Sequence, residues 1–462
     1  MRPLEIIVTL LLVVYLLWKH PRPFAIRLAP AAALLVTLIH FALEGYRWQM
    51  IPIYVLTAAL MLSALLKIRS TGDWKPLAST LALILLAVST ALPTILPVPS
   101  IPAPSGPYEV GTTIYELTDS SRTELYSGKD EARRFQIQVW YPAEPGPADE
   151  RAQWMNHAKV FSRSISTGIL DLPPFFLDHL ALVKLPAYKD SKLASTNDGY
   201  PVILFSHGWN GFNAQNTGQA LQLASHGYVV IGVQHTYGAV VTVFDDGTVA
   251  ANNPSALPEG APDDEYDIAA HTLADQWAGD MGFALDFIGE QNGDSNSQFF
   301  NSIDLSLVGV YGHSTGGGAA IQFCGTDTRC KALFGQDPFM RPVSYEVLES
   351  GVTQPSFFMF SQVWTDDVGS INNRLFDGFH ANSKQAVGAV SIEGTAHYDF
   401  SDLPLLSPLT PQLGLKGPIN GRRVTTIIDD YLLSFFEMTL RGTPSDLFNK
   451  QSQEYDEVKS TH

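Results

Sequence analysis

The fold of this chain is decided by the stretch Leu305–Ile321, which reads LSLVGVYGHSTGGGAAI. It holds an apolar run typical of a buried strand, then a G-x-S-x-G motif centred on Ser314, then a run typical of a helix. The turn between such a strand and helix is sharp, so the residues two before and two after the serine must be small, and the hydroxyl is exposed at the strand end. The motif alone is weak evidence in a chain with 36 glycines, so the flanking strand and helix carry the prediction that Ser314 is a nucleophile.

Short β-rich runs alternate with helical runs on both sides of this stretch, from about residue 108 onward. This alternation is typical of a parallel sheet covered by helices. We therefore predict that residues 108–462 form a domain of the α/β class with the α/β-hydrolase fold, in which helices flank a mostly parallel central sheet. The expected strands are Phe135–Tyr141, Val202–Phe205, Tyr228–Val233, Leu305–Tyr311, Ala332–Gly335, Phe357–Phe360 and Ala389–Ile392, and the expected helices are Ala214–Ser225, Asp267–Ile288, Thr315–Phe323 and Thr425–Thr439.

A nucleophilic serine needs two partners, an imidazole that accepts its proton and a carboxylate that fixes the tautomer of that imidazole. In α/β-hydrolase chains the carboxylate comes next after the serine, and the histidine follows it. His397 lies in a loop directly after the expected strand Ala389–Ile392, so it is the predicted base. The acid stays open between Asp337, at the end of the strand after the serine, and Asp366 or Asp367, which follow the next strand.

Several motifs occur together in the chain: Phe205–Gly208, Leu223–Tyr228, Gly312–Gly318, Asp337, Gly394–His397 and Phe400. In this combination the chain resembles the plasma-type and intracellular type II platelet-activating factor acetylhydrolases and their bacterial relatives, over roughly residues 130–400. In that family the acid follows the strand directly after the serine, so the resemblance favours Asp337. The oxyanion needs backbone donors, which Thr315 supplies as the residue after the nucleophile and Trp209 supplies by resemblance. No metal or organic cofactor is implied.

The first hundred residues have a different character. Four apolar runs follow one another, with no charge inside the last three and Glu5 at the edge of the first. None shows the polar stripe at helical spacing that a soluble surface helix needs. We therefore expect residues 1–97 to be a membrane segment with spans near 4–18, 28–43, 50–66 and 77–97. The familiar members of the resembled family lack such a segment.

The loops between these runs predict an orientation. Three basic residues follow the first run and three follow the third, whereas the only charged residues in the second loop are Glu44 and Arg47. Basic loops stay cytoplasmic, so the large domain is expected outside the cytoplasm at the cell membrane. If only three runs span, the domain lies inside instead. Prolines recur in Thr94–Pro107 and favour an extended spacer, so residues 98–107 are expected to form a stalk.

The charge of the chain is unevenly distributed. The formal net charge is −17, yet residues 1–105 hold eight basic and three acidic side chains, so the acidity belongs to the domain that follows. A nucleic-acid partner is excluded, because neutralising phosphates needs clustered Lys and Arg. The expected partners are the membrane and a phospholipid or other ester substrate.

Cys324 and Cys330 are too few for a zinc site, and in an extracytoplasmic domain they are expected to form a disulfide. The apolar insertion Val160–Tyr188 is either a lid or acyl-binding wall or ordinary core packing, and the sequence leaves both open. Other histidines lack metal-ligand spacing and are expected to be structural, namely His207, His226, His235 and His271.

Three functions are consistent with the sequence. The resemblance implies a membrane-tethered serine esterase that cleaves short or oxidised sn-2 acyl esters of phospholipids through an acyl-enzyme. A second hypothesis keeps the triad and assigns it to a general carboxyl ester or a polyester. A third is a membrane receptor or binding protein whose hydrolase-like domain does not catalyse. The acyl group, the head group and the oligomeric state stay open.

Overall fold

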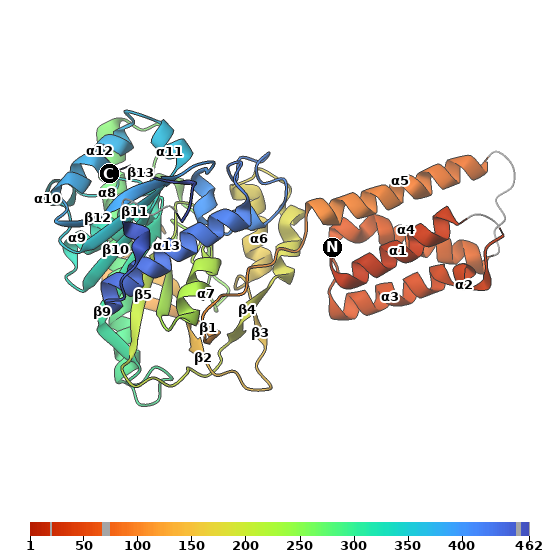
Figure 1. Ribbon diagram of the computed structural model, residues 1–462, viewed down its shortest axis with the longest axis horizontal. Helices are drawn as coiled ribbons and strands as arrows, with labels where there is room; N and C mark the ends of the chain where they lie inside the picture. The colour runs from red at the N-terminus through yellow and green to blue at the C-terminus, as the bar shows by residue number, and fades with distance from the viewer. Residues whose placement is uncertain (19–20, 67–73, 450–453, 462) are drawn as a thin grey trace.

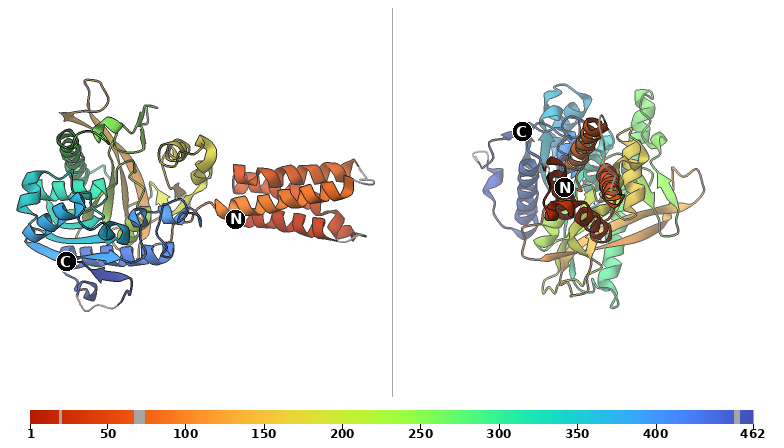
Figure 2. Two further views of the ribbon diagram at one scale, coloured as in Figure 1. Left: turned by 90° about the horizontal axis from the view of Figure 1, so that it is seen from above. Right: turned by 90° about the vertical axis from the view of Figure 1, so that its right-hand side faces the viewer.

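The structure is a computed structural model that describes residues 1–18, 21–66, 74–449 and 454–461. Figures 1 and 2 show two parts, a bundle of helices formed by the first hundred residues and an α/β globule formed by the rest. The bundle projects from one side of the globule. The N-terminus lies at the end of the bundle nearest the globule.

A large sheet forms the centre of the globule. Its strands are β1 (Glu109–Thr123), β2 (Ala132–Ala143), β3 (Arg151–Gln153), β4 (Lys184–Lys189), β5 (Tyr200–Ser206), β6 (Val229–Gln234), β9 (Ile303–His313), β10 (Cys330–Gln336), β11 (Pro355–Ser361), β12 (Gln385–Ile392) and β13 (Val458–Ser460). The order of the 11 strands is β13-β12-β11-β10-β9-β5-β6-β2-β1-β4-β3. Neighbours from β12 to β6 are parallel, whereas β2 pairs antiparallel with both β6 and β1. Two short strands, β7 (Val241–Val243) and β8 (Val249–Ala251), form a separate hairpin.

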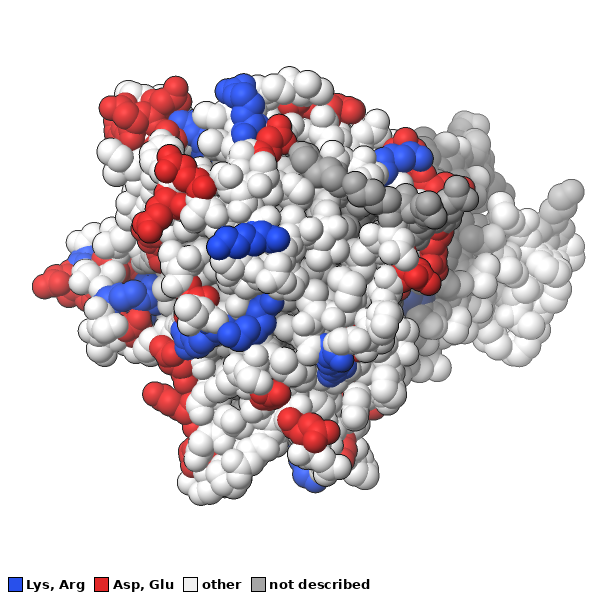
Figure 3. All heavy atoms as spheres, turned by 60° about the vertical axis from the view of Figure 1, so that its left-hand side comes forward, with Lys and Arg blue, Asp and Glu red and all other residues white. Residues whose placement is uncertain are grey.

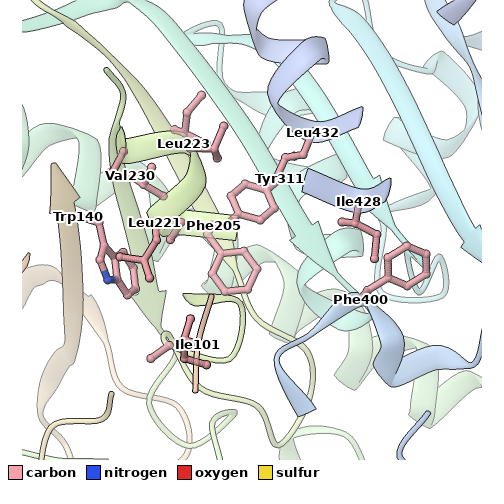
Figure 4. Packing of buried hydrophobic residues seen from close by; sticks show 14 of the residues in the cluster. Ile101, Trp140, Phe205, Leu221, Leu223, Val230, Tyr311, Phe400, Ile428 and Leu432 are labelled. Carbon is pink, nitrogen blue, oxygen red and sulfur yellow. The ribbon is translucent and has the colours of Figure 1, made fainter. Parts of the chain in front are cut away.

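Helices cover both faces of this sheet. They are α6 (Ala158–Gly168), α7 (Thr217–Ser225), α8 (Asp263–Gly293), α9 (Thr315–Thr326), α10 (Tyr345–Ser350), α11 (Gln362–Asp366), α12 (Ile371–Asn382) and α13 (Gly421–Arg441), with 3₁₀ turns η2 (Pro174–Leu182), η3 (Pro254–Ala256), η4 (His397–Phe400), η5 (Leu403–Leu405) and η6 (Asp446–Phe448). Residues of α7 and α13 belong to the apolar core on one face, and residues of α8 and α9 to the core on the other. Figure 4 shows Phe205 and Tyr311 side by side on neighbouring strands, between the leucines of α7 and Ile428 of α13.

The predicted α/β class and mostly parallel sheet are confirmed, and each strand and helix expected from the sequence is present within five residues of its predicted ends. The long strand β1 was not predicted. Its sequence, EVGTTIYELTDSSRT, is rich in Thr, Ser and Asp, residues that also favour turns, and most of its positions are half-buried or exposed. Its pairing with β2 over nearly its whole length makes it a strand.

Four main helices form the N-terminal bundle: α1 (Pro3–Leu17), α3 (Ala29–Leu43), α4 (Ile51–Leu65) and α5 (Trp74–Ile95), with the short α2 (Phe24–Arg27) and η1 (Trp48–Met50). The prediction of four membrane spans is wrong. Among the described residues, only Trp48–Leu65 and Leu77–Ile95, of 18 and 19 residues, are long and apolar enough to cross a membrane. Helices α1 and α3 have 15 residues each, about 22 Å of rise against a hydrocarbon core of about 30 Å. Apolar composition showed that they avoid water but not that they reach across a bilayer.

The predicted orientation depends partly on residues outside the described ranges. Lys19, Lys67 and Arg69 lie there, and the side chain of Lys75 is not described either. Figure 1 places α2, with Arg27 in its last turn, at the end of the bundle farthest from the globule.

The bundle meets the globule through specific contacts. The indole N–H of Trp48 donates to the carbonyl of Phe176 in η2 at 3.0 Å, and the side-chain amide of Gln49 lies 2.8 Å from Nδ1 of His179. The ring of Trp48 also packs edge-on against Phe175, with centroids 5.5 Å apart. The insertion that contains η2 is therefore one of the parts of the globule that the bundle contacts.

The proline-rich segment between the two parts is extended, and it packs along the globule. Ile101 is only 4% exposed. The N–H of Ser105 donates to Gln222 at 2.9 Å, and the N–H of Gly106 donates to the hydroxyl of Ser225 at 3.1 Å. Both partners belong to α7, so this stretch is anchored to the helix.

Charged side chains lie scattered over the surface of the globule. Figure 3 shows acidic and basic residues interspersed with neutral ones on one face. The excess of acidic residues that the sequence gives to this domain therefore lies on a surface in contact with water.

Candidate active site

Ser314 lies at the junction of β9 and α9, in the strained turn that its motif predicts. Its φ of 58° and ψ of −125° are rare for a residue with a side chain. The turn is held by its backbone, because the Ser314 N–H donates to the carbonyl of Gln336 and the Ser314 carbonyl accepts from the N–H of Phe339, at 3.0 and 2.9 Å. A Cβ on Gly316 would lie 2.2 Å from the carbonyl oxygen of Ser206, so this position admits only glycine.

His397 and Asp337 are brought together from two different strand ends. Nδ1 of His397, the first residue of η4, lies 3.0 Å from Oδ2 of Asp337, which directly follows β10. Asp337 also accepts from the backbone N–H and the hydroxyl of Ser361, at 2.7 and 2.6 Å. The alternative acids Asp366 and Asp367 are exposed at the end of α11. Of the three carboxylates considered, the structure pairs Asp337 with the histidine.

Burial dominates the electrostatics of this pair. It raises the pKa of Asp337 to about 7, an effect that the hydrogen bonds from Ser361 only partly offset. It also lowers the pKa of His397. A neutral imidazole can accept a proton through Nε2, because Nδ1 is occupied by Asp337.

His313, the residue before the serine, is a part of the site that sequence reasoning missed. Its Nε2 lies 2.9 Å from the backbone carbonyl of His397, and its Nδ1 lies 3.1 Å from the side-chain amide of Gln215. Nε2 therefore carries the proton, and Nδ1 accepts from the amide. Burial lowers the pKa of His313 to about 3, so the ring stays neutral. The only signal in the sequence was a polar residue at the second position of the motif.

The predicted oxyanion donors lie beside the serine. Thr315 is the first residue of α9, so its N–H has no acceptor within the helix. Trp209 follows Gly208, and a Cβ on Gly208 would lie 3.1 Å from Cβ of Ser314. The loop that carries Trp209 therefore passes close to the nucleophile, as a second oxyanion donor requires.

A cavity of about 310 Å³ joins these groups. One of its walls comes from the insertion that was expected to be either a lid or acyl-binding wall or ordinary core packing. Ile165 is a core residue that also lines the cavity, and Ile169, which packs against the same core, lines it too. Among the described lining residues Glu259 is the carboxylate, and none is Lys or Arg. The lining comprises Ile165, Gly168, Ile169, Gly208, Trp209, Asn210, Gly211, Phe212, Gln215, Glu259, His313, Ser314, His397, Tyr398, Ser401 and Leu403.

Among the described residues, one group of side chains is close enough together to bind a metal ion. It lies in the bundle and consists of Glu5, His40 and Glu44. Glu5 is already bound by Arg47, whose Nε donates to it at 2.7 Å, and by Arg2 at 2.9 Å. Two guanidinium groups on one carboxylate oppose a cation, so the cluster fits an ion-pair network better than a metal. In the globule, Cys324 and Cys330 form a disulfide.

Comparison with known proteins places these features in a family. Residues 96–457 match the family model described as "Platelet-activating factor acetylhydrolase, isoform II". The platelet-activating factor acetylhydrolase of Cavia porcellus is 27% identical over 361 residues, which cover 74% of this chain and 78% of that protein. The "Probable 1-alkyl-2-acetylglycerophosphocholine esterase" of Arthroderma benhamiae is 24% identical over 407 residues, covering 82% and 97%.

Among solved structures, a ferulic acid esterase from Streptomyces cinnamoneus superposes with a TM-score of 0.62 at 23% identity, covering 79% of this chain and 100% of that one. At this identity the likeness concerns the fold. It agrees with the α/β-hydrolase arrangement of sheet and helices described above.

Proposed function

Because the chain belongs to the platelet-activating factor acetylhydrolase isoform II family, we propose that it hydrolyses short or oxidised sn-2 acyl esters of phospholipids with a Ser314–His397–Asp337 triad. The enzyme is a carboxylic ester hydrolase. The observation that carries the finer proposal is that the strained serine and a carboxylate-paired histidine line one cavity.

The first half of the proposed reaction forms an acyl-enzyme. Nε2 of His397 takes the proton of the Ser314 hydroxyl as the oxygen attacks the ester carbonyl. The N–H groups of Thr315 and Trp209 receive the negative charge of the tetrahedral intermediate. When the carbonyl re-forms, the bond to the lysophospholipid oxygen breaks, and His397 returns its proton to that oxygen.

The second half releases the acid. A water molecule gives a proton to His397 and attacks the acyl carbonyl, and collapse of the new tetrahedral intermediate returns that proton to the oxygen of Ser314. Asp337 keeps the imidazole in the tautomer that this sequence needs, through its contact with Nδ1. The reaction balances with ester and water as its only reactants.

The cavity supports a small acyl group and a head group without net negative charge. A space of about 310 Å³ shared with the catalytic side chains leaves little room for a long acyl chain. The carboxylate of Glu259 in the lining disfavours an anionic head group and favours a cationic one, such as choline.

The bundle supports attachment to a membrane, because two of its segments are long and apolar enough to cross one, namely Trp48–Leu65, which joins η1 to α4, and Leu77–Ile95 of α5. Its near end contacts the two segments that also line the cavity. One is the insertion with α6 and η2, which Trp48 contacts. The other is the segment that begins with η5: Leu403 of η5 lines the cavity, and just after η5 the Ser407 hydroxyl donates to the carbonyl of Ile95 at 2.6 Å. A lipid in that membrane would be close to the cavity.

The decisive experiment uses the detergent-solubilised full chain and a fluorophosphonate probe. We expect Ser314→Ala to lose labelling and at least about 10⁴-fold in turnover of 2-acetyl phosphatidylcholine. Ser306→Ala is the matched control, because Ser306 is exposed on the same strand. Retained turnover in Ser314→Ala, or absence of labelling in the wild type, would contradict the triad.

Two further measurements test the substrate and the attachment. Turnover of 2-acetyl phosphatidylcholine should exceed that of the 2-palmitoyl lipid, and equal rates on p-nitrophenyl esters of any acyl length would indicate a general carboxylesterase. For attachment, the full chain should stay in the membrane pellet after alkaline carbonate extraction. Its release into the supernatant would exclude an integral anchor.

A further inference from the structure

A second Ser–His–Asp set lies inside the globule. The hydroxyl of Ser206, at the end of β5, is 2.9 Å from Nε2 of His235, and Nδ1 of His235 is 3.0 Å from Oδ2 of Asp280 in α8. Two guanidinium groups bind the same carboxylate. Arg133 contacts both oxygens at 3.0 and 2.7 Å, and Arg122 contacts Oδ1 at 2.9 Å.

This set does not form a second catalytic centre. Ser206, His235 and Asp280 are each 0% exposed. The imidazole of His235 is stacked on the indole of Trp277, with centroids 4.2 Å apart and an interplanar angle of 4°. No ester can reach a serine enclosed in this way, so the set must act on its protein surroundings.

The protonation of the set follows from its partners. Burial raises the pKa of Asp280, but the charge of Arg133 and the hydrogen bonds from His235 and Arg133 outweigh it and lower the pKa. Burial lowers the pKa of His235, so the ring is neutral. The proton of His235 is therefore on Nδ1, facing the carboxylate, and Nε2 accepts from the hydroxyl of Ser206.

One path leads from His235 to the loop beside the nucleophile. The backbone N–H of His235 donates to Nε2 of His207 at 3.2 Å, and Nδ1–H of His207 donates to the carbonyl of Gly208 at 2.7 Å. Gly208 passes close to the nucleophile, since a Cβ on it would lie 3.1 Å from Cβ of Ser314. The orientation of the peptide between Gly208 and Trp209, which carries the Trp209 N–H, is thus tied to His235.

A second path runs through the turn after His235. The N–H of Asn210 donates to the carbonyl of Gly238 at 3.0 Å, and the N–H of Val240 donates to the carbonyl of Gly211 at 2.9 Å. Asn210 has a φ of 59°, in the left-handed region, so the loop needs external support to keep this conformation. On one side of Trp209, Gly208 is therefore linked to His235 through His207, and on the other side Asn210 and Gly211 are bonded to the turn that His235 begins.

We propose that Asp280, His235 and Ser206 are positioning residues that hold the Trp209 N–H at the oxyanion of the reaction. They touch neither the substrate nor the reacting atoms. This inference rests on the proposed esterase function, because the oxyanion is formed only if Ser314 attacks an ester.

The test compares Ser206→Ala and His235→Gln with Tyr141→Phe in the full chain. Tyr141 is a suitable control because its hydroxyl is buried and donates to the carbonyl of Ser191 at 2.7 Å, away from the loop. We expect kcat to fall roughly 10- to 100-fold in the first two variants, since misplacing one donor by a fraction of an ångström weakens transition-state binding. KM should stay within about threefold. Tyr141→Phe should match Ser206→Ala in melting temperature and keep wild-type kcat.

Two readouts separate positioning from general destabilisation. Hydrogen–deuterium exchange of residues 207–211 should rise in Ser206→Ala and not in Tyr141→Phe. The pH profile of kcat/KM should keep its midpoint, because the His397–Asp337 pair is untouched. Wild-type kcat in a folded Ser206→Ala, or unchanged exchange in the loop, would overturn the inference. A wild-type chain that does not label with fluorophosphonate would overturn the proposed function instead.

Discussion

The globule contains two sets of the same three residue types, and we propose only one of them, Ser314, His397 and Asp337, as a reaction site. Ser314 lies in a strained turn at a cavity, whereas Ser206 lies in regular strand geometry with 0% exposure. Each set contains a histidine whose Nδ1 is 3.0 Å from an aspartate. Hydrogen-bond geometry therefore does not distinguish a catalytic pair from a structural one, and access to substrate does.

The two aspartates also differ in whether a positively charged side chain is bound to them. Asp280 is ion-paired with Arg133 and Arg122, and although burial raises its pKa, the charge of Arg133 and the hydrogen bonds from His235 and Arg133 lower it. Asp337 receives its side-chain and backbone hydrogen bonds from Ser361 and His397, and burial raises its pKa to about 7. The buried set is fixed in one protonation state, whereas the accessible pair can exchange protons near neutral pH.

The largest expected effect concerns the acid of the accessible pair. Asp337→Asn should lower kcat by about 10⁴-fold, because the amide cannot hold His397 in the productive tautomer. Steady-state turnover of 2-acetyl phosphatidylcholine measures this, with Asp366→Asn as the control at an exposed carboxylate. A loss below tenfold, or an equal loss in Asp366→Asn, would reject Asp337 as the acid.

The corresponding change in the buried set should act on stability. Among the residues that the structure describes, Asp280→Asn leaves the guanidinium of Arg133 with only Glu124 as its charged partner, at 2.6 Å. Removing one partner of such a buried pair destabilises by about 3 to 5 kcal/mol. The free energy of unfolding from urea titration measures the loss.

Asp286→Asn is the control for that measurement, because Asp286 lies on the same helix in an exposed pair with Arg329. An exposed pair contributes about 0 to 1 kcal/mol. Equal losses in the two variants would show that burial does not distinguish these pairs, and the comparison would fail.

Much of the accessible site could be predicted from the sequence, because local pattern and chain order determine it. The sequence predicted the strand before Ser314, the small residues of its turn and a histidine after a late strand. The family resemblance made Asp337 the favoured acid. The structure pairs Asp337 with His397, although 60 residues separate them.

The buried set could not be predicted, since it depends on packing. Ser206 and His235 are 29 residues apart and His235 and Asp280 are 45 apart, on three different elements. Nothing in the local sequence of α8 indicates that Asp280 faces inward. The wrong prediction of four membrane spans has a related cause. An apolar run shows that a helix avoids water, but it does not determine how long the folded helix is.

The two pairs should also differ in pH dependence. The active form of the accessible pair has an ionised Asp337 and a neutral His397, so adding one proton inactivates it. Because burial raises the pKa of Asp337 to about 7, kcat/KM should fall with decreasing pH below about 7, approaching tenfold per unit. Asp280, whose pKa is lowered, should contribute no midpoint between pH 5 and 8. A flat profile from pH 5 to 8 would contradict a titrating accessible pair.

The smallest expected effect concerns how each histidine is held. His235 is fixed by the stacked Trp277, whereas His397 is fixed by His313, whose ring lies 4.5 Å away and donates to its backbone carbonyl. His313→Phe keeps a ring in this place and removes both hydrogen bonds of the imidazole, the one to the carbonyl of His397 and the one from the side-chain amide of Gln215. We expect kcat to fall about tenfold, since His397 can then drift from Ser314.

The melting temperature of His313→Phe should change little, because an aromatic ring still fills the space beside His397. His226→Phe is the matched control, since His226 caps the C-terminal end of α7 and its imidazole bonds to that helix, to the hydroxyl of Ser225 and the carbonyl of Gln222. The fluorophosphonate labelling rate of Ser314 should fall in parallel with kcat in His313→Phe and stay unchanged in His226→Phe. If labelling stays at the wild-type rate while kcat falls, His313 is not needed for the attack of Ser314. In that case Asp337 alone holds His397 in place for the first step, and the role proposed here for His313 in that step is wrong.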